Sequence, residues 1–201
     1  MAIQAVIFDF GGVLVRTEDR SPRQELADSL GMTYAELNGL IFESEPARLA
    51  TVGEITTQER WEILRAELSL SADDFPRVPK EFFGGDVLDE ALIDYIHALR
   101  PRFKTALLSN AWDDLRGVVI NEWQIADAFD ELIISAEEGV AKPDAGIYEL
   151  TLERLNVAPS EAVFVDDFPR NIEGAQAVGM HAIHFQDSRQ ARAELDGLLV
   201  R

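Results

Sequence analysis

The sequence predicts an α/β protein whose core is a Rossmann-like, doubly wound parallel sheet, with a small helical cap domain inserted into it. Five short apolar runs are rich in β-branched residues, and helical patterns separate the last four of them. Strands that alternate with helices form parallel sheets with both faces covered. In addition, about 90 residues separate the first run from the second, far more than the single crossover helix that a parallel pair needs.

The predicted strands lead into residues that can bind a ligand. In open parallel sheets, ligands bind beyond the carboxyl ends of the strands. The first, second and fourth runs are followed there by polar side chains, which are Asp9, Ser109, Asn110, Asp166 and Asp167. We therefore expect these side chains to share one edge of the sheet. The five predicted strands are Ala5–Phe8, Thr105–Leu108, Glu131–Ser135, Ala162–Val165 and His181–Phe185.

The long insertion contains helix starts of its own. Three segments match the capping box, in which a Ser or Thr is followed three residues later by Glu or Gln. They begin at Ser21, Thr33 and Thr56. Residues 16–83 are therefore predicted to form the helical cap domain, and residues 1–15 together with 84–201 the α/β core domain.

Two further helices are predicted in the core domain. The segment Phe82–Asp86, with its two glycines, is interpreted as the hinge by which the chain returns from the cap. The helix Leu88–Leu99 then precedes the second strand, and the tail Ser188–Val200 is expected to form a last surface helix.

Composition excludes several classes of function. Against 18 Lys and Arg stand 37 Asp and Glu, and the net charge of -19 repels nucleic acid and anionic membranes. The absence of cysteine excludes disulfides and thiolate metal sites. No apolar stretch reaches the roughly 18 residues of a membrane span, and the apolar start has no basic residues before it. We expect a cytoplasmic monomer or homodimer that binds neither nucleic acid nor membrane.

Three of the strand-end clusters are individually ambiguous. Asp9 precedes Gly11 and Gly12, so it is either a nucleophile or metal ligand, or a turn former. Ser109 and Asn110 can hydrogen-bond a phosphate oxygen, but either can also cap the next helix.

Lys142 stands directly before a helix start at Pro143-Asp144. There it can supply the cation for a phosphate or a carboxylate, and the alternative is a solvated surface lysine.

The fourth cluster is the most specific. Asp166 and Asp167 are adjacent acids at the end of an apolar strand, and two such carboxylates repel each other unless a cation lies between them. Oxygen ligands without His or Cys indicate Mg²⁺.

Taken together and in this chain order, the four clusters resemble the haloacid dehalogenase superfamily. In that family a strand-end Asp, a strand-end Ser or Thr, a Lys and a pair of acids surround one phosphoryl site. The resemblance covers nearly the whole chain, including a helical cap inserted after the first motif. The stretch from Val163 to Met180 is similar to the subgroup with a DD-x-x-x-N fourth motif.

The resemblance implies a role for each motif residue. Asp9 would be the catalytic nucleophile, with Lys142 balancing its charge, and Ser109 with Asn110 would bind phosphate. The Mg²⁺ ligands would be Asp9, the carbonyl of Gly11, Asp166 and Asp167, with Asn171 as a possible supporting residue. The implied function is a Mg²⁺-dependent phosphatase that hydrolyses a small phosphorylated metabolite through an aspartyl-phosphate intermediate.

One position departs from the family pattern. Most phosphatases of the superfamily carry a second Asp two residues after the nucleophile, where it acts as general acid and base, and here that position is Gly11. Such groups contribute roughly 10²–10⁴-fold to rate, so we expect slow turnover unless a cap residue such as Glu18 substitutes. The alternatives are a metal-independent dehalogenase, or a non-catalytic protein that binds a phosphate ligand or a partner. The sequence does not identify the substrate.

Overall fold

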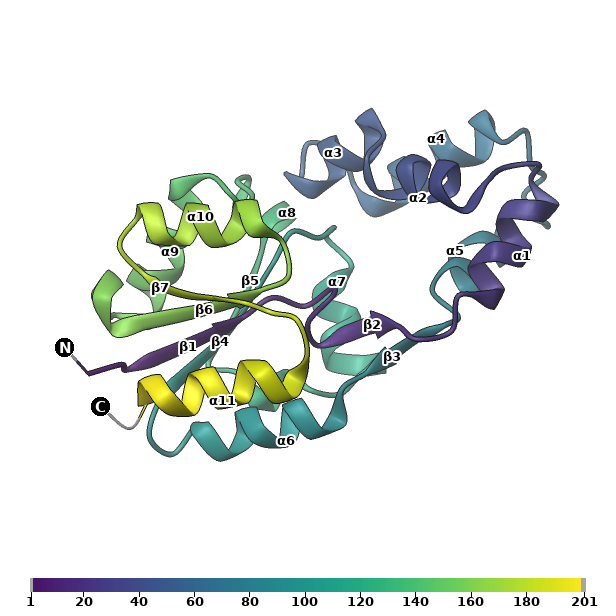
Figure 1. The fold of residues 1–201 in the computed structure, drawn as a ribbon. Helices are drawn as coiled ribbons and strands as arrows, with labels where there is room; N and C mark the ends of the chain where they lie inside the picture. Colours follow the sequence, from purple (N-terminus) through teal and green to yellow (C-terminus); the bar gives the residue numbers. More distant parts are fainter. Residues whose placement is uncertain (1, 200–201) are drawn as a thin grey trace.

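The computed structural model describes residues 2–199, and its centre is a five-stranded sheet (Figure 1). Every neighbouring pair in the sheet runs parallel, in the order β5-β4-β1-β6-β7. The order reverses at the central strand β1, as it does in doubly wound folds. The predicted α/β fold class is therefore confirmed. The strands are β1 (Ala5–Phe8), β4 (Lys104–Ser109), β5 (Glu131–Ile134), β6 (Ala162–Asp166) and β7 (His181–His184).

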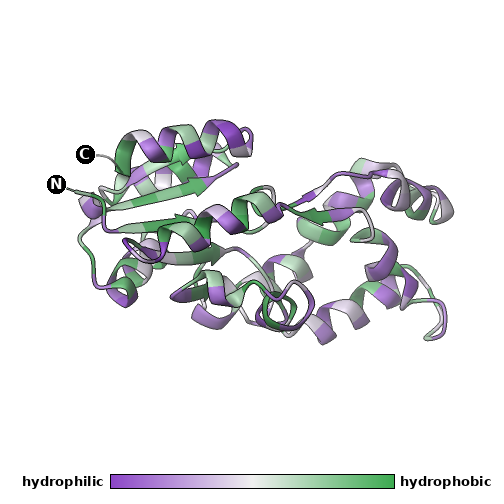
Figure 2. Ribbon diagram, turned by 90° about the horizontal axis from the view of Figure 1, so that it is seen from below, coloured by the Kyte–Doolittle hydropathy of each residue, from purple (hydrophilic) through white to green (hydrophobic). Residues whose placement is uncertain are grey.

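Helices cover both faces of the sheet, so the side chains of β1 enter two separate cores. Val6 and Phe8 pack into the cluster that α6 (Glu90–Leu99) and α11 (Ser188–Leu199) close. Ala5 and Ile7 pack on the opposite face, under α9 (Ala145–Leu155) and α10 (Pro169–Ala177). Figure 2 shows the strands as hydrophobic and the outer helices as mixed, the pattern expected when both faces of a parallel sheet are buried.

The insertion forms a group of helices that lies apart from the sheet (Figure 1). These helices have their own hydrophobic cluster, which includes Leu26, Leu37, Ile41 and Phe82, each fully buried. The division into a cap of residues 16–83 and a core of the remaining chain stays a prediction. The helices are α1 (Ser21–Ser29), α2 (Tyr34–Phe42), α3 (Glu45–Thr51), α4 (Thr57–Glu67) and α5 (Arg77–Phe82).

Short helical elements complete the core. They lie in the connections from β4 to β5 and from β5 to β6. They are α7 (Leu115–Gly117), the π-helix η1 (Val118–Glu122), the 3₁₀ helices η2 (Ala126–Ala128) and η3 (Pro159–Glu161), and α8 (Ser135–Glu138).

The connection between the two parts is a two-stranded antiparallel ribbon that the sequence analysis did not predict. It pairs β2 (Val15–Thr17) with β3 (Asp86–Leu88). The buried guanidinium of Arg23, on α1, donates to Thr17 Oγ1 at 3.0 Å and to Asp86 Oδ1 at 3.2 Å. This one side chain therefore ties the first cap helix to both strands of the ribbon.

Two helix boundaries differ from the prediction. The helix expected at Leu88–Leu99 begins only at Glu90, because Leu88 belongs to the ribbon and the Asp89 side chain accepts the Leu92 N–H at 2.9 Å as the N-cap. The tail helix extends to Leu199, and the Val200 expected at its end lies outside the described residues.

Two of the three predicted capping boxes form. Thr33 and Thr56 cap α2 and α4, each with the Glu three residues later bonding back. The box predicted at Ser21 is wrong: Ser21 already lies inside α1, whose N-cap is Arg20, and the Ser21 N–H donates to Asp19 Oδ1 at 2.8 Å.

No helix within residues 2–199 is both long and apolar enough to span a membrane.

The two outcomes at the helix starts can be measured directly. Thr33→Ala should lower the free energy of unfolding by about 1 kcal/mol, because it leaves a helix N–H without its acceptor. Ser21→Ala is the matched control and should change it by only a few tenths of that amount, since the Ser21 hydroxyl caps nothing. Urea denaturation of the two variants provides the comparison, and equal losses would contradict the difference in capping.

Candidate active site

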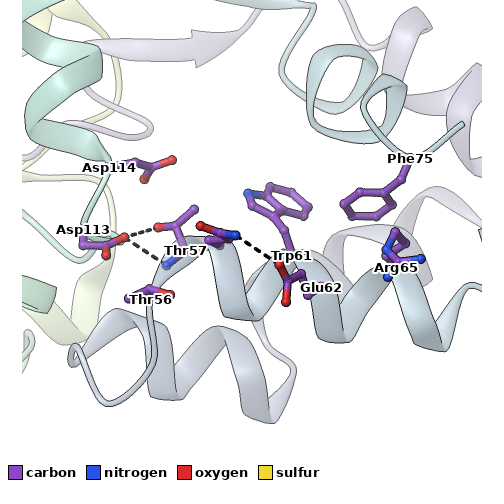
Figure 3. A pocket seen from close by; sticks show the side chains of 9 residues that line it. Thr56, Thr57, Trp61, Glu62, Arg65, Phe75, Asp113 and Asp114 are labelled. Atoms are coloured by element: carbon purple, nitrogen blue, oxygen red, sulfur yellow. Dashed lines mark hydrogen bonds between the residues drawn. The ribbon is translucent and has the colours of Figure 1, made fainter. Parts of the chain in front are cut away.

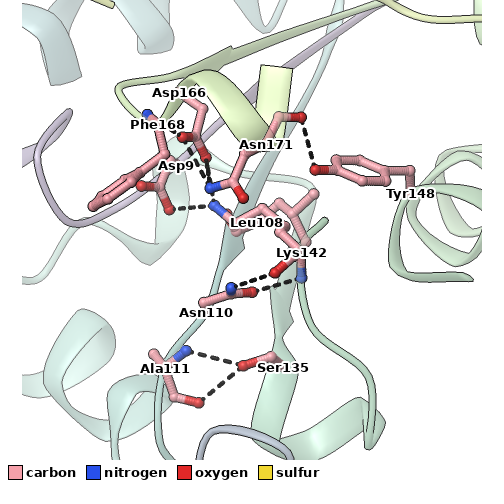
Figure 4. A network of polar contacts seen from close by, with 10 residues as sticks. All are labelled: Asp9, Leu108, Asn110, Ala111, Ser135, Lys142, Tyr148, Asp166, Phe168 and Asn171. Carbon is pink, nitrogen blue, oxygen red and sulfur yellow. Dashed lines mark hydrogen bonds and ion pairs between the residues drawn. The ribbon is translucent and has the colours of Figure 1, made fainter. Parts of the chain in front are cut away.

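The strand-end residues meet at the carboxyl edge of the sheet, as the sequence analysis expected. In β1, Phe8 lies opposite Leu107 of β4 and Val165 of β6, so the residues that follow these strands emerge side by side. Asp9, at 6% exposure, and Asp166, at 0%, are both buried there. Figure 4 shows their carboxylates converging with Lys142.

Lys142 is the centre of this group. Its Nζ donates to Asp9 Oδ1 at 2.6 Å, to Asp166 Oδ2 at 2.7 Å and to the carbonyl of Leu108 at 2.9 Å. Its side chain is 1% exposed, so the alternative of a solvated surface lysine is wrong. Burial by itself would lower the pKa of Lys142, but the charges of the two carboxylates outweigh burial and raise it, so the ammonium stays charged.

Asn110 holds Lys142 in place through the backbone. Its Nδ2 donates to the Lys142 carbonyl, and its Oδ1 accepts the Lys142 N–H, both at 2.8 Å (Figure 4). From the sequence, Asn110 is predicted to bind phosphate, and no sequence pattern indicates this contact with Lys142. The neighbouring Ser109 is 4% exposed, and no described residue hydrogen-bonds its hydroxyl, which is therefore available to a phosphate oxygen.

Asn171 orients Asp166. Its Nδ2 lies 3.0 Å from each oxygen of the Asp166 carboxylate, and the backbone N–H of Phe168 donates to Asp166 Oδ1 at 2.7 Å. Tyr148, on α9, in turn donates to the Asn171 carbonyl at 2.8 Å. The sequence contained no signal for Tyr148, because its contact joins helices that are distant in the chain.

Three carboxylates could hold a metal ion. Ligand oxygens of Asp9, Asp166 and Asp167 all lie within 4.8 Å of one another. Asp167 Oδ1 is buried without a hydrogen-bond partner in the described structure, which a cation would remedy. The donors are all oxygen, so the set fits Mg²⁺. The fourth ligand proposed from the sequence, the Gly11 carbonyl, stays a prediction.

The two glycines after Asp9 have different constraints. Gly12 has a φ of +86°, and a Cβ there would lie 2.3 Å from Asp167 Oδ2, so only glycine fits against this acid. Gly11 does not have a positive φ, and a Cβ at Gly11 would meet no atom within 4 Å.

The electrostatics of the site favour binding of a divalent cation. Burial raises the pKa of Asp9 to about 7, with Asp166 adding to the shift and Lys142 opposing it. Burial also raises the pKa of Asp167, and the charge on Asp166 raises it further. Three carboxylates face one ammonium, so full ionisation leaves an excess of two negative charges that Mg²⁺ would balance.

Other candidates lie outside this group. Glu18, considered as a substitute acid, has a side chain 57% exposed and pairs with Arg16 at 3.5 Å. A cavity of about 680 Å³ opens between α4 and the loop after β4 (Figure 3). Its lining includes Thr57, Trp61 and Asp113, and none of the three clustered acids contributes to it.

Comparison with known proteins identifies a family and several relatives. The family model for haloacid dehalogenase-like hydrolases matches residues 3–179. Pig bifunctional epoxide hydrolase 2 is 30% identical over 98% of the chain, which spans only 39% of that relative's length. A sesquiterpene phosphatase from Aspergillus oryzae is 28% identical, with 98% of this chain and 96% of the relative covered. D-ribitol-5-phosphate phosphatase from Bacteroides thetaiotaomicron is 26% identical, with 98% of each covered.

Solved structures share the fold. A haloacid dehalogenase (HAD) family enzyme from Bacteroides thetaiotaomicron was crystallised with magnesium and inorganic phosphate. It superposes with a TM-score of 0.78 at 22% identity, over 94% of this chain and 99% of that one. A predicted HAD-like hydrolase from Porphyromonas gingivalis gives a TM-score of 0.79 at 20% identity, over 97% and 98%.

The pKa of Asp9 predicts how stability depends on pH. Its folded value of about 7 lies above its ordinary value of 3.8. The proton on Asp9 therefore stabilises the folded state, and this contribution is lost as pH rises through about 7. In metal-free buffer the melting temperature should fall between about pH 6 and pH 8. Mg²⁺ should raise it more at the higher pH, where it does not compete with the proton.

Thermal melts at both pH values, with EDTA or with Mg²⁺, test this expectation. The variant with both Asp166→Asn and Asp167→Asn is the control, since it should lose the Mg²⁺ response. A Mg²⁺ response that persists in this variant would end the assignment of the metal site.

Proposed function

The chain belongs to the haloacid dehalogenase-like hydrolases, and on that basis we propose that it is a Mg²⁺-dependent phosphatase acting on a small phosphorylated metabolite through an aspartyl-phosphate on Asp9. The observation that carries the proposal is the buried contact of Lys142 with both Asp9 and Asp166, beside the partnerless carboxylate oxygen of Asp167. Phosphatases among the relatives support it.

Each of the clustered residues has its own role in phosphoryl transfer. Asp9 attacks phosphorus through a carboxylate oxygen, and the bond from phosphorus to the leaving oxygen breaks. Lys142 orients Asp9 and favours its ionised form against the effect of burial, and the Ser109 hydroxyl donates to a phosphate oxygen. Mg²⁺, when bound by the three acids, would offset the charge of the phosphate and of the carboxylates. Water then hydrolyses the aspartyl-phosphate and restores Asp9.

The weak step is proton transfer to the leaving oxygen. Gly11 occupies the position where most phosphatases of this family carry an acid, and the exposed Glu18 is paired with Arg16 instead. Substrates with poor leaving groups should therefore react slowly, because they depend on protonation in the transition state.

The absence of that acid also favours a second candidate, a dehalogenase in which Asp9 would attack a carbon that carries halogen. Such an enzyme has no use for the metal-binding acids, whereas Asp166 is fully buried and Asp167 lies beside it, both within the group of clustered oxygens. Assays of a panel of phosphate esters and of 2-haloacids, each with and without Mg²⁺, distinguish a phosphatase from a dehalogenase and from a binding protein. Halide release without metal would replace the phosphatase proposal, and release of neither product would favour a binding protein.

Replacement of the nucleophile gives the first functional prediction. Asp9→Asn should abolish phosphate release and leave the fold intact, because the amide is nearly isosteric but does not attack phosphorus. Asp94→Asn, on the exposed face of α6, removes the same charge away from the site and should leave the rate unchanged. Steady-state phosphate release measures both, and an Asp9→Asn rate above a few per cent of wild type would remove Asp9 from this role.

Restoration of the missing acid gives the second functional prediction. The backbone of Gly11 tolerates a side chain, since its φ is not positive and a Cβ has open space. Gly11→Asp should therefore fold normally and speed up hydrolysis of alkyl phosphates by some fraction of the roughly 10²–10⁴-fold range of acid-base catalysis. Activated aryl phosphates should gain less, because their leaving groups need no proton.

The comparison requires both ester classes and both proteins, with melting temperatures as the control for folding. An unchanged ratio of alkyl to aryl rates in a well-folded Gly11→Asp protein would show that another group already acts as the acid, or that phosphoryl transfer is not the function.

A further inference from the structure

Arg60, on the cap helix α4, is a buried cation without an ion-pair partner among residues 2–199. The residue is 2% exposed, and its Nη2 donates to the Ile41 carbonyl at 2.7 Å. Its Nε and Nη1 are buried and have no hydrogen-bond partner in the described part of the chain. The guanidinium carbon lies 4.1 Å from the ring centroid of Trp61 and 3.5 Å from that of Trp112, so the cation sits between two indole rings.

This arrangement is unfavourable for stability alone. Burial lowers the pKa of Arg60 to about 10, with only the charge of Asp114 opposing the shift. The two indole faces compensate part of the desolvation. A well-packed apolar side chain in place of a poorly paired buried charge is often neutral or stabilising. An unpaired buried charge in an otherwise well-packed region therefore indicates a functional constraint.

One of the two rings belongs to the core rather than to the cap. Trp112 packs into the hydrophobic cluster of the cap, where it also stacks on Phe42 at 6.0 Å between ring centroids. It follows Ser109 by three residues and Asn110 by two. Arg60 is therefore one of the polar contacts through which the cap holds the loop that carries the proposed phosphate-binding residues.

Contacts lead from this loop to the nucleophile. Ala111, next to Trp112, is held by Ser135, which accepts its N–H at 3.0 Å and donates to its carbonyl at 3.2 Å (Figure 4). Asn110 then fixes both backbone groups of Lys142, and Lys142 holds Asp9. A displacement of Trp112 would thus be transmitted to Lys142 through an amide side chain only two residues away.

The neighbouring cap residues dock on the same side of the core. Thr57 donates its N–H to Asp113 Oδ1 at 2.9 Å, and its hydroxyl bonds to the same oxygen (Figure 3). At Gly53 the backbone approaches so closely that a Cβ would lie 2.1 Å from the Ala136 carbonyl oxygen. Arg60 belongs to this docked segment, and among residues 2–199 it is the cation that lies over the ring of Trp112.

We propose that Arg60 is a positioning residue, which clamps Trp112 so that Asn110 keeps Lys142 aligned with Asp9 when the cap is docked. Its effect on rate rests on the proposed phosphatase function, whereas its effect on the loop does not. A purely structural role would make stability depend on Arg60 and leave the Lys142 backbone unaffected. The positioning role predicts that stability does not depend on Arg60 and that the Lys142 backbone is affected by its loss.

The test replaces Arg60 by Met, which has similar length and no charge. Arg60→Met should fold with an equal or higher melting temperature, and its kcat should fall about 10- to 100-fold with little change in KM, because a small misplacement of catalytic groups is costly. Arg65→Met is the matched control on the same helix and should leave kcat unchanged, since the Arg65 side chain donates to the Leu70 carbonyl and, among the described residues, makes no other hydrogen bond. Arg60→Lys keeps the cation and should recover part of the rate.

Hydrogen exchange provides a readout that does not depend on activity. The amides of Ala111 and Lys142 are bonded to Ser135 Oγ and Asn110 Oδ1, so their exchange should be faster in Arg60→Met and unchanged in Arg65→Met. The double variant Arg60→Met with Trp112→Leu should lose no more rate than Trp112→Leu alone.

Unchanged exchange of both amides in Arg60→Met would overturn the inference, as would a kcat equal to wild type or a protein that no longer folds. If the wild-type protein releases no phosphate, the proposed function fails, and the exchange measurement still decides the role of Arg60.

Discussion

The arrangement of this protein depends on one ammonium group that two buried carboxylates share. Asp9 and Asp166 end neighbouring parallel strands, and without a cation their charges would repel each other at the sheet edge. Lys142 Nζ lies 2.6 Å from one carboxylate and 2.7 Å from the other. Much of the surrounding polar structure serves this contact, since Asn110 fixes the Lys142 backbone and Asn171 fixes the Asp166 carboxylate. The remaining negative charge is what makes the site suited to a divalent cation.

The rigidity of that contact comes from the sheet, and the cap contacts the loop beside it. The strands are buried on both faces, so the residues at their ends have little freedom to move. The cap has a hydrophobic cluster of its own and meets the core through the β2–β3 ribbon and through the segment from Gly53 to Trp61. The buried Arg60 between two indoles lies where this second connection reaches the loop after β4.

The pair of glycines after the nucleophile separates a structural requirement from a functional choice. Gly12 cannot carry a side chain, because Asp167 occupies the space of its Cβ and its φ is positive. Gly11 could carry one, and nothing in its surroundings or backbone prevents an acid there. The missing acid is therefore not a consequence of the fold. In the proposed phosphatase, its absence restricts the substrates mainly through their leaving groups, because poor leaving groups need a proton.

The amino-acid sequence was sufficient to predict the five core strands, the insertion after the first of them and the residues at the strand ends. These follow from apolar periodicity and from the rule that parallel strands present their carboxyl ends together. Only the packing of the elements in three dimensions buries Lys142, brings Asn110 within hydrogen-bond distance of its backbone, and places Arg60 against Trp112 across the cap boundary. It also decided the three-residue strands of the ribbon and the absence of a cap at Ser21. The reason is physical: a periodic pattern reports which face of an element is buried, whereas a single contact between residues distant in the chain depends on how whole elements pack.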